Sequence, residues 1–254
     1  MVLAHRSATG PFDILGDIHG CIDELRALME LLGYDVLASD GSIRAPAGRT
    51  AVFLGDLVDR GPDSMAVLRL AMEMVETGAA ICLIGNHDDK LWRKLIGRKV
   101  QLKHGLAETL AQLACEPAAM QDRVRRFLGD LPSHRVLDGG RLVVAHAGLK
   151  TSLHGRETGR ARDFALYGAT TGRLDAAGLP IRLDWAMDYA GHARVVYGHT
   201  PVAEPRWTNG TINIDTGCVF GGRLTALRYP ELELVSVSAR APYATLARPF
   251  LPDH

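Results

Sequence analysis

In the first ninety residues, three apolar segments each end in glycine followed by aspartate or asparagine. These segments are FDILGDIH (12–19), TAVFLGDLVD (50–59) and AAICLIGNHD (79–88). Between them, residues 22–33 and 63–78 place apolar side chains at helical spacing and stop at glycine. This βαβαβ rhythm predicts parallel strands joined by crossover helices. Because ligand sites in open α/β sheets lie beyond the carboxyl ends of the strands, we expect the polar residues there to carry the chemistry.

The second half of the chain predicts strands with fewer intervening helices. An Asp-Gly-Gly turn within 135–148 predicts a hairpin, and 195–200, 211–217 and 223–238 are further strand candidates. The last of these contains a turn at Pro230 and Glu231, whereas residues 90–130 have a helical pattern. We therefore expect one α/β domain over 1–254, with a parallel-rich first half and an antiparallel-rich second half. Its core would span about 12–239, followed by an irregular tail at 240–254.

Composition limits the function classes. The chain has 254 residues with 29 Lys+Arg and 29 Asp+Glu, and this zero formal net charge argues against a broadly basic nucleic-acid binder. Its four cysteines form no CxxC pair, which favours reduced thiols in the cytosol. We find no signal-peptide pattern and no apolar run as long as a membrane span. The expectation is a soluble cytoplasmic protein with no membrane contact.

Five short motifs supply candidate metal ligands. They are GDIHG (16–20), GDLVDRG (55–61), GNHD (85–88), AHAG (145–148) and YGHT (197–200). The candidate ligands are Asp17, His19, Asp56, Asn86, His146 and His199. Oxygen and imidazole donors without thiolate suit Mn²⁺, Fe or Zn²⁺ better than a structural cysteine-bound zinc. Six ligands exceed the need of one four-coordinate ion, so we expect two metals, with Asp56 able to bridge them.

Simpler interpretations remain for individual motifs. GDIHG alone could be a strand-to-helix turn with a capping aspartate, and His146 or His199 alone could be a core histidine. The three ordered motifs together make the ligand interpretation the stronger one.

The GDxHG, GDxxDRG and GNHD triplet resembles the calcineurin-like metallophosphoesterases, in the branch shared with phosphoprotein phosphatases and diadenosine tetraphosphatases. The resemblance implies a four-layer αββα sandwich with two mixed sheets and a two-metal centre. Carried over by motif, the first metal would be held by Asp17, His19 and Asp56. The second would be held by Asp56, Asn86, His146 and His199. The implied metals are two divalent ions, Mn²⁺ first, with Ni²⁺, Fe or Zn²⁺ as alternatives.

The resemblance also implies the catalytic roles. A hydroxide held between the metals would attack phosphorus. Arg60 would clamp phosphate oxygens, with Asn86 and His87 also contacting the substrate. His87 would protonate the leaving group, and Asp59 would orient His87. The alternative for Arg60 is an ion pair with Asp59.

Three stretches, at 162–172, 195–207 and 211–237, look like the phosphatase module of bacterial polynucleotide kinase-phosphatases. This likeness implies removal of 2′- or 3′-phosphates and opening of 2′,3′-cyclic phosphates on nucleotides or RNA ends. The expected partners are such a substrate and other modules of an RNA end-healing protein, and a homodimer is left open. No GxxxxGK[ST] loop is present, so the chain would be an excised module or a free-standing relative. The alternatives are a dinucleoside tetraphosphatase, a protein Ser/Thr phosphatase and, from another class, a non-catalytic metal-binding scaffold.

Further candidates stand outside the motifs. Residues 90–107 contain six basic residues and no acidic one, namely Lys90, Arg93, Lys94, Arg98, Lys99 and Lys103. They form either a solvated helical face or an electrostatic rim that attracts phosphate-rich substrates. Arg162 is a candidate phosphate contact or an exposed surface arginine, and Asp215 either orients a ligand or closes a strand-end turn.

Overall fold

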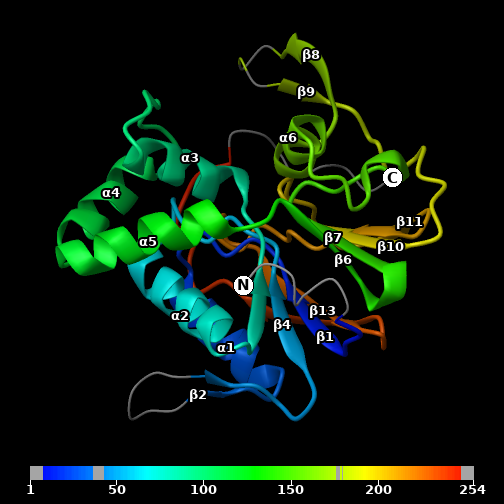
Figure 1. Cartoon of the computed structure of the whole chain (residues 1–254), viewed down its shortest axis with the longest axis horizontal. Coiled ribbons are helices and arrows are strands. Elements are labelled where there is room, and N and C mark those ends of the chain that lie inside the picture. Colours follow the sequence, from blue (N-terminus) through cyan, green and yellow to red (C-terminus); the bar gives the residue numbers. More distant parts are fainter. Residues whose placement is uncertain (1–7, 37–42, 176–177, 179, 247–254) are drawn as a thin grey trace.

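A computed structural model of the chain describes residues 8–36, 43–175, 178 and 180–246. Two five-stranded sheets pack face to face, and helices lie against their outer faces (Figure 1). The first sheet has the order β14-β13-β1-β4-β5. Its three parallel strands adjoin two antiparallel ones, with the bounds β1 Phe12–Leu15, β4 Thr50–Phe53, β5 Ala80–Cys82, β13 Arg223–Tyr229 and β14 Glu233–Ser238.

The second sheet has the order β11-β12-β10-β7-β6. Its strands are β6 His134–Leu137, β7 Leu142–Ala145, β10 Arg194–Tyr197, β11 Trp207–Thr208 and β12 Thr211–Asn213. The central strands β7, β10 and β12 run parallel to one another. The sheet is therefore mixed, because long connections separate its parallel central strands and antiparallel pairs flank them. Among the described strands of the second half, antiparallel pairs are the majority, as expected. The predicted hairpin at the Asp-Gly-Gly turn is confirmed by the antiparallel pair β6 and β7.

Helices complete the layers. The first sheet is covered by α1 (Ile22–Leu31) and α2 (Ser64–Glu76), and the second by α6 (Gly159–Tyr167). Both predicted crossover helices are confirmed, slightly shorter than expected. The carboxylate of Asp63 accepts the Ala66 N–H at 2.8 Å and caps α2. The remaining helices, which pack beside the first sheet, are α3 Asn86–Leu95, α4 Leu106–Ala114 and α5 Ala118–Asp130, and 3₁₀ turns occupy Asp138–Gly140 and Thr151–Leu153.

Three apolar clusters hold the layers together. Side chains from both sheets, including Ile14, Val52, Val144 and Ile212, fill the space between the sheets. A larger cluster lies between the first sheet and its helices, and a smaller one lies under α6. This is the expected α/β fold of two mixed sheets flanked by helices.

Two hairpins lie outside the sandwich. The first pairs β2 (Asp35–Val36) with β3 (Ile43–Arg44), and the second pairs β8 (Thr170–Leu174) with β9 (Pro180–Arg182). The second hairpin, which the sequence did not predict, projects from the body of the molecule beside α6 (Figure 1). Within the described ranges, no helix is long and apolar enough to cross a membrane. The expected tail at 240–254 is described only to residue 246, where Pro242 bridges Phe220; residues 247–254 lie outside the described part.

Candidate metal centre

All six predicted ligands follow the carboxyl ends of parallel strands. Asp17 and His19 come after β1, Asp56 after β4, and Asn86 begins α3 after β5. The second sheet adds one histidine after β7 and one after β10, His146 and His199. The ends of both sheets therefore meet at one edge of the sandwich. We call the six residues the ligand cluster.

The backbone around the ligand cluster is tightly packed and strained. A Cβ on Gly85 would lie 2.2 Å from the backbone nitrogen of Asp56, and one on Gly198 would lie 2.2 Å from Asp17 Oδ1. Five non-glycine residues there have positive φ: His19 (48°), Asp56 (49°), Asp59 (74°), Arg60 (71°) and His199 (73°). Each such residue costs about 1–3 kcal/mol, so the surrounding contacts must hold these loops in place. The ordinary turn interpretation of GDIHG does not account for this concentration of strain.

Three potential donor atoms converge on Nε2 of His146. Its Nε2 lies 3.0 Å from Asn86 Oδ1, 3.0 Å from His199 Nδ1 and 3.5 Å from Asp56 Oδ2. These separations match the distances between ligand atoms that bind one cation through bonds of about 2.0–2.2 Å. In addition, the buried Nε2 of His199 has no hydrogen-bond partner among the residues that the structure describes. These residues fit a divalent metal ion.

The other half of the cluster shares the same carboxylate. Asp56 Oδ2 lies 3.5 Å from Nε2 of His19, the same distance that separates it from Nε2 of His146. His19 Nδ1 donates to the carbonyl oxygen of Val58 at 2.9 Å, which leaves a lone pair on Nε2. Arg60 Nη1 donates to that lone pair at 2.6 Å. Asp17 accepts the backbone N–H of His199 at 3.0 Å, which ties the loops of the two sheets together.

Burial opposes charge throughout the cluster. Desolvation, together with the neighbouring Asp215 and Asp56, raises the pKa of Asp17 well above its usual range. Desolvation and the charge of Asp88 do the same for the pKa of Asp56. Burial lowers the pKa of His146 to about 3, so its imidazole is neutral and keeps a lone pair for a ligand bond. Buried carboxylates beside neutral imidazoles are the arrangement that divalent cations stabilise.

Asp88 is a supporting residue to which the sequence assigned no role, although it ends the GNHD motif. Its carboxylate accepts the Leu57 N–H at 3.0 Å and the Gly85 N–H at 2.9 Å. It therefore joins the loop after β4 to the start of α3. Burial raises the pKa of Asp88 to about 7, and the two backbone donors oppose that shift.

The predicted acid and its partner are in contact. His87 Nδ1 lies 2.6 Å from Asp59 Oδ2, and the imidazole stands edge-on to that of His19 with ring centroids 4.8 Å apart. Thr109 of α4 donates to the other oxygen of Asp59 at 2.7 Å, a contact that no sequence motif signals. Burial raises the pKa of Asp59 to about 6, whereas burial and the charge of Arg60 lower the pKa of His87.

Arg60 does not form the alternative ion pair with Asp59. Its guanidinium contacts His19 and lies 5.2 Å from the ring centroid of Phe220. The head group therefore sits at the ligand cluster, held over an aromatic face.

Of the candidates outside the motifs, some lie near the ligand cluster and others do not. Asp215 is buried beside the cluster, accepts the Gly217 N–H at 3.0 Å and raises the pKa of Asp17 through its charge. Arg162 Nη2 pairs with Asp89 Oδ1 at 2.7 Å and lines a different cavity from His199. Of the basic stretch, Lys90 acts electrostatically on both Asp59 and His87, and its Nζ donates to the Lys103 carbonyl at 3.0 Å.

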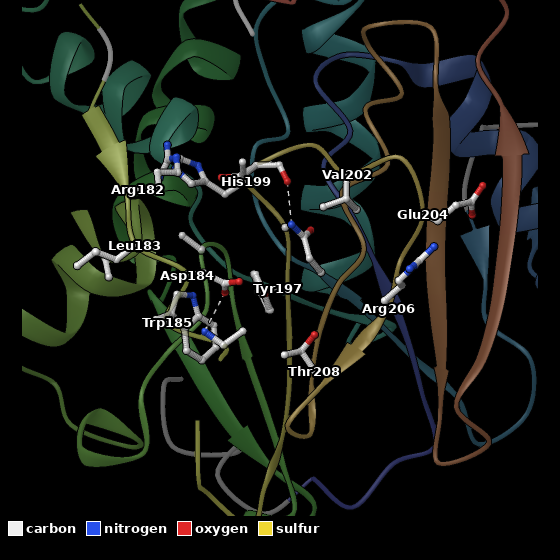
Figure 2. A pocket seen from close by; sticks show the side chains of 17 residues that line it. Arg182, Leu183, Asp184, Trp185, Tyr197, His199, Val202, Glu204, Arg206 and Thr208 are labelled. Atoms are coloured by element: carbon white, nitrogen blue, oxygen red, sulfur yellow. Dashed lines mark hydrogen bonds between the residues drawn. The ribbon is translucent and has the colours of Figure 1, made fainter. Parts of the chain in front are cut away.

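A cavity of about 250 Å³ opens next to the ligand cluster and includes His199 in its wall (Figure 2). The wall continues through the strand ends of the second sheet and the segment after β9. Sequence reasoning missed this cavity because the hairpin that carries one side of it was not predicted.

Comparison with known proteins agrees with this geometry. Residues 10–235 match the family model described as calcineurin-like phosphoesterase. Bis(5′-nucleosyl)-tetraphosphatase PrpE (asymmetrical) of Anoxybacillus flavithermus is 48% identical over 94% of this chain and 99% of its own. The protein of the same name from Bacillus subtilis is 48% identical over 91% of this chain and 96% of its own.

Solved structures also align. A crystal structure described as "a putative diadenosine tetraphosphatase" has a TM-score of 0.65 at 27% identity, covering 92% of this chain and 98% of that one. A serine/threonine phosphatase from Saccharomyces cerevisiae has a TM-score of 0.60 at 14% identity, covering 92% of this chain and 80% of that one. The second likeness shows the fold alone.

These relatives correct the expected substrate. Proteins named as tetraphosphatases match nearly the whole chain at 45–48% identity, so the expected action on 2′,3′-cyclic and RNA-end phosphates was wrong. The likeness to the phosphatase module of polynucleotide kinase-phosphatases is likewise not supported. The stretches at 162–172, 195–207 and 211–237 do not single out RNA-end enzymes, because the alignment with these relatives runs through nearly the whole chain.

Proposed function

The chain belongs to the calcineurin-like phosphoesterase family of metal-dependent hydrolases, and on that premise we propose that it cleaves bis(5′-nucleosyl) tetraphosphates asymmetrically. The products would be one nucleoside monophosphate and one nucleoside triphosphate. The observation that carries this proposal is the 48% identity to an asymmetrical tetraphosphatase across 94% of this chain and 99% of the relative. The alignment therefore spans nearly all of both chains.

The ligand cluster would hold two divalent metals, as is general in the family. Asp17, His19 and Asp56 would bind the first, and Asp56, Asn86, His146 and His199 the second. When bound, such ions polarise phosphoryl oxygens and make a nucleophile available from water near neutral pH. Mn²⁺ is our first choice because the donors are carboxylate, amide and imidazole with no thiolate.

Arg60 would hold the phosphate chain. Its planar guanidinium offers paired N–H donors that match two phosphate oxygens. Phe220 supports the guanidinium from one side at 5.2 Å, which restricts the directions in which the donors can point. With metal bound at His19 Nε2, Arg60 Nη1 would lose this acceptor and be available to donate to a phosphate oxygen.

His87 would deliver a proton to the departing oxygen from Nε2. Its Nδ1 is held by Asp59, and Asp59 is itself fixed by Thr109 on one oxygen. This chain of contacts sets the plane of the imidazole and directs Nε2 away from Asp59. Burial lowers the pKa of His87, and the negative charge of a bound phosphate chain would favour its protonated form.

A substrate panel tests the proposal. Metal-depleted protein would be reconstituted with Mn²⁺ and given diadenosine tetraphosphate, 3′-AMP, 2′,3′-cyclic AMP and a phosphoserine peptide. We expect the highest kcat/KM on the tetraphosphate, with AMP and ATP in equal amounts by chromatography. Formation of two ADP, or a higher kcat/KM on the phosphoserine peptide, would overturn the proposal.

A further inference from the structure

The cavity beside His199 has the chemistry of a nucleoside site. Trp185 and Tyr197 form one wall, with their ring centroids 5.1 Å apart. Trp185 is fixed from behind by edge contacts with Phe164 and Tyr189, at 5.9 and 6.0 Å. Fixed aromatic faces bind nucleobases by stacking, which contributes about 1–3 kcal/mol per base.

A carboxylate lies on the same wall. Asp184 follows β9, and its Oδ1 accepts the Ala186 N–H at 3.2 Å, which orients the group and leaves Oδ2 available for a ligand. Figure 2 shows Asp184 between Trp185 and Tyr197. Carboxylates recognise ribose hydroxyls in nucleotide sites, so base and sugar both have suitable partners here.

The cavity is small and open to the ligand cluster. Its volume of about 250 Å³ lies below the roughly 300–1,000 Å³ typical of drug-sized ligands, so it suits one nucleoside and not both. His199 and Gly198 form its inner end, and Gly198 directly borders Asp17 Oδ1. The cavity therefore ends at the ligand cluster, and the phosphate nearest to a nucleoside in the cavity would be the one nearest to the cluster.

Arg182 stands where the cavity meets the ligand cluster. It lies beside His199 in Figure 2, and its charge acts on both His146 and His199. Its Nη1 donates to the Tyr167 carbonyl at 2.7 Å, which holds the guanidinium at this position. A phosphate carried directly by the nucleoside in the cavity would lie between Arg182 and the cluster.

From this juxtaposition we infer that the cavity binds the nucleoside whose own phosphate is attacked, so the reaction occurs at the phosphorus bonded to the 5′-oxygen. This inference rests on the proposed tetraphosphatase function. The oxygen of water bonds to that α-phosphorus, and the bond from the α-phosphorus to the α,β-bridging oxygen breaks. The bridging oxygen leaves with the nucleoside triphosphate, and the protons of water pass to the leaving group and the solvent.

Attack on the β-phosphorus would give the same two products, so identifying the products does not distinguish the two sites of attack. The product that contains the oxygen atom from water does distinguish them. Mn²⁺-reconstituted protein would hydrolyse diadenosine tetraphosphate in H₂¹⁸O, and mass spectrometry would locate the label. We expect one ¹⁸O in AMP and none in ATP. Unlabelled AMP and ATP incubated under the same conditions control for exchange.

Each outcome has a distinct meaning. Label in ATP overturns the inference while the tetraphosphatase function stands. Two ADP, or no hydrolysis of the tetraphosphate, overturns the proposed function and the inference with it.

Two variants test the cavity itself. For Asp184→Asn, the ratio of kcat/KM on diadenosine tetraphosphate to that on p-nitrophenyl phosphate should fall about tenfold or more, the value of one charged hydrogen bond. Arg182→Ala should lower kcat/KM on both substrates, because both present the attacked phosphate that Arg182 would contact. Arg173→Ala is the matched control, because Arg173 is exposed on the neighbouring strand β8 and does not line the cavity. An unchanged ratio in Asp184→Asn, an equal fall in the control, or full activity of Arg182→Ala on both substrates removes the cavity from substrate binding.

Discussion

The ligand cluster and the cavity wall adjoin each other but are built in opposite ways. Asp17, His19, Asp56 and His146 are at most 4% exposed and sit on loops with positive φ and almost no free space. In the cavity wall, by contrast, Leu183 is 51% exposed, and Asp184, Glu204 and Arg206 are also exposed. Few amino acids fit each position of the ligand cluster, whereas many fit the exposed positions of the cavity wall.

This difference suggests that the ligand cluster carries out the reaction and that the cavity wall selects the substrate. In the proposed reaction the cluster would contact phosphate and water, which are the same in every phosphoester, so a rigid site built from short motifs suits it. The wall would contact the group to which the phosphate is attached, and its residues come from separate stretches around β9, β10 and β12. Substitutions further from the cluster should therefore lower the reaction rate less, and their effect should differ more from one substrate to another.

Asp56→Asn should have the largest effect, because Asp56 Oδ2 faces both halves of the cluster at 3.5 Å. Loss of the shared carboxylate should lower kcat about 10³-fold or more on every substrate, equal to about 4 kcal/mol of transition-state stabilisation. Metal content by inductively coupled plasma mass spectrometry should fall with it. Asp122→Asn, on the exposed face of α5, is the control that should leave both values unchanged. Full metal occupancy with full activity would refute the bridging role.

His87 lies beside the ligand cluster, and the loss of activity in His87→Ala should depend on the leaving group. Removing a proton donor costs about 10²–10⁴-fold where the leaving group is poor. Kinetics on phenyl phosphate should therefore suffer far more than kinetics on p-nitrophenyl phosphate, whose phenolate leaves without a proton. The backbone N–H of His87 still donates to Asp56 Oδ1, so metal content should be retained. An equal loss on both esters would exclude the acid role.

Thr109→Val tests the support behind the acid. Thr109 donates to Asp59 at 2.7 Å from α4, and without this bond Asp59 and His87 lose their fixed orientation. One such bond is worth about 1 kcal/mol, which predicts a fall in kcat of about fivefold with little change in KM. Thr109→Ser retains the hydroxyl and should restore most of the loss. A fall in KM and kcat together, with no rescue by serine, would indicate a packing defect.

Thr109 also shows where sequence reasoning stops. The strand ends, the crossover helices and the convergence of the six cluster residues were predictable because short loops after parallel strands keep polar residues within a few positions of the strand ends. Thr109 lies 50 residues from Asp59, and its contact depends on how α4 packs. The same holds for Arg182 and Trp185, which reach the cavity only through the projecting hairpin. The substrate was mispredicted because the stretches at 195–207 and 211–237 were compared as sequence, whereas the cavity to which they contribute forms only when they lie beside Arg182 and Trp185.

Lys90→Gln should have the smallest effect and the strongest dependence on salt. Lys90 lies one turn into α3 beside Asp59 and His87, on the side from which a triphosphate protonated by His87 would depart. Partly exposed charges contribute about 0.2–1 kcal/mol, so KM for diadenosine tetraphosphate should rise about twofold to fivefold at low ionic strength. The rise should shrink as salt screens the charge, and it should be absent with p-nitrophenyl phosphate, which has no polyphosphate to attract. Lys94→Gln, one turn further along the helix, is the matched control. Equal effects of the two variants would mean that the whole basic stretch attracts substrate from a distance. An effect of Lys90 alone would mean that Lys90 contacts the departing triphosphate, on the opposite side of the ligand cluster from the nucleoside cavity.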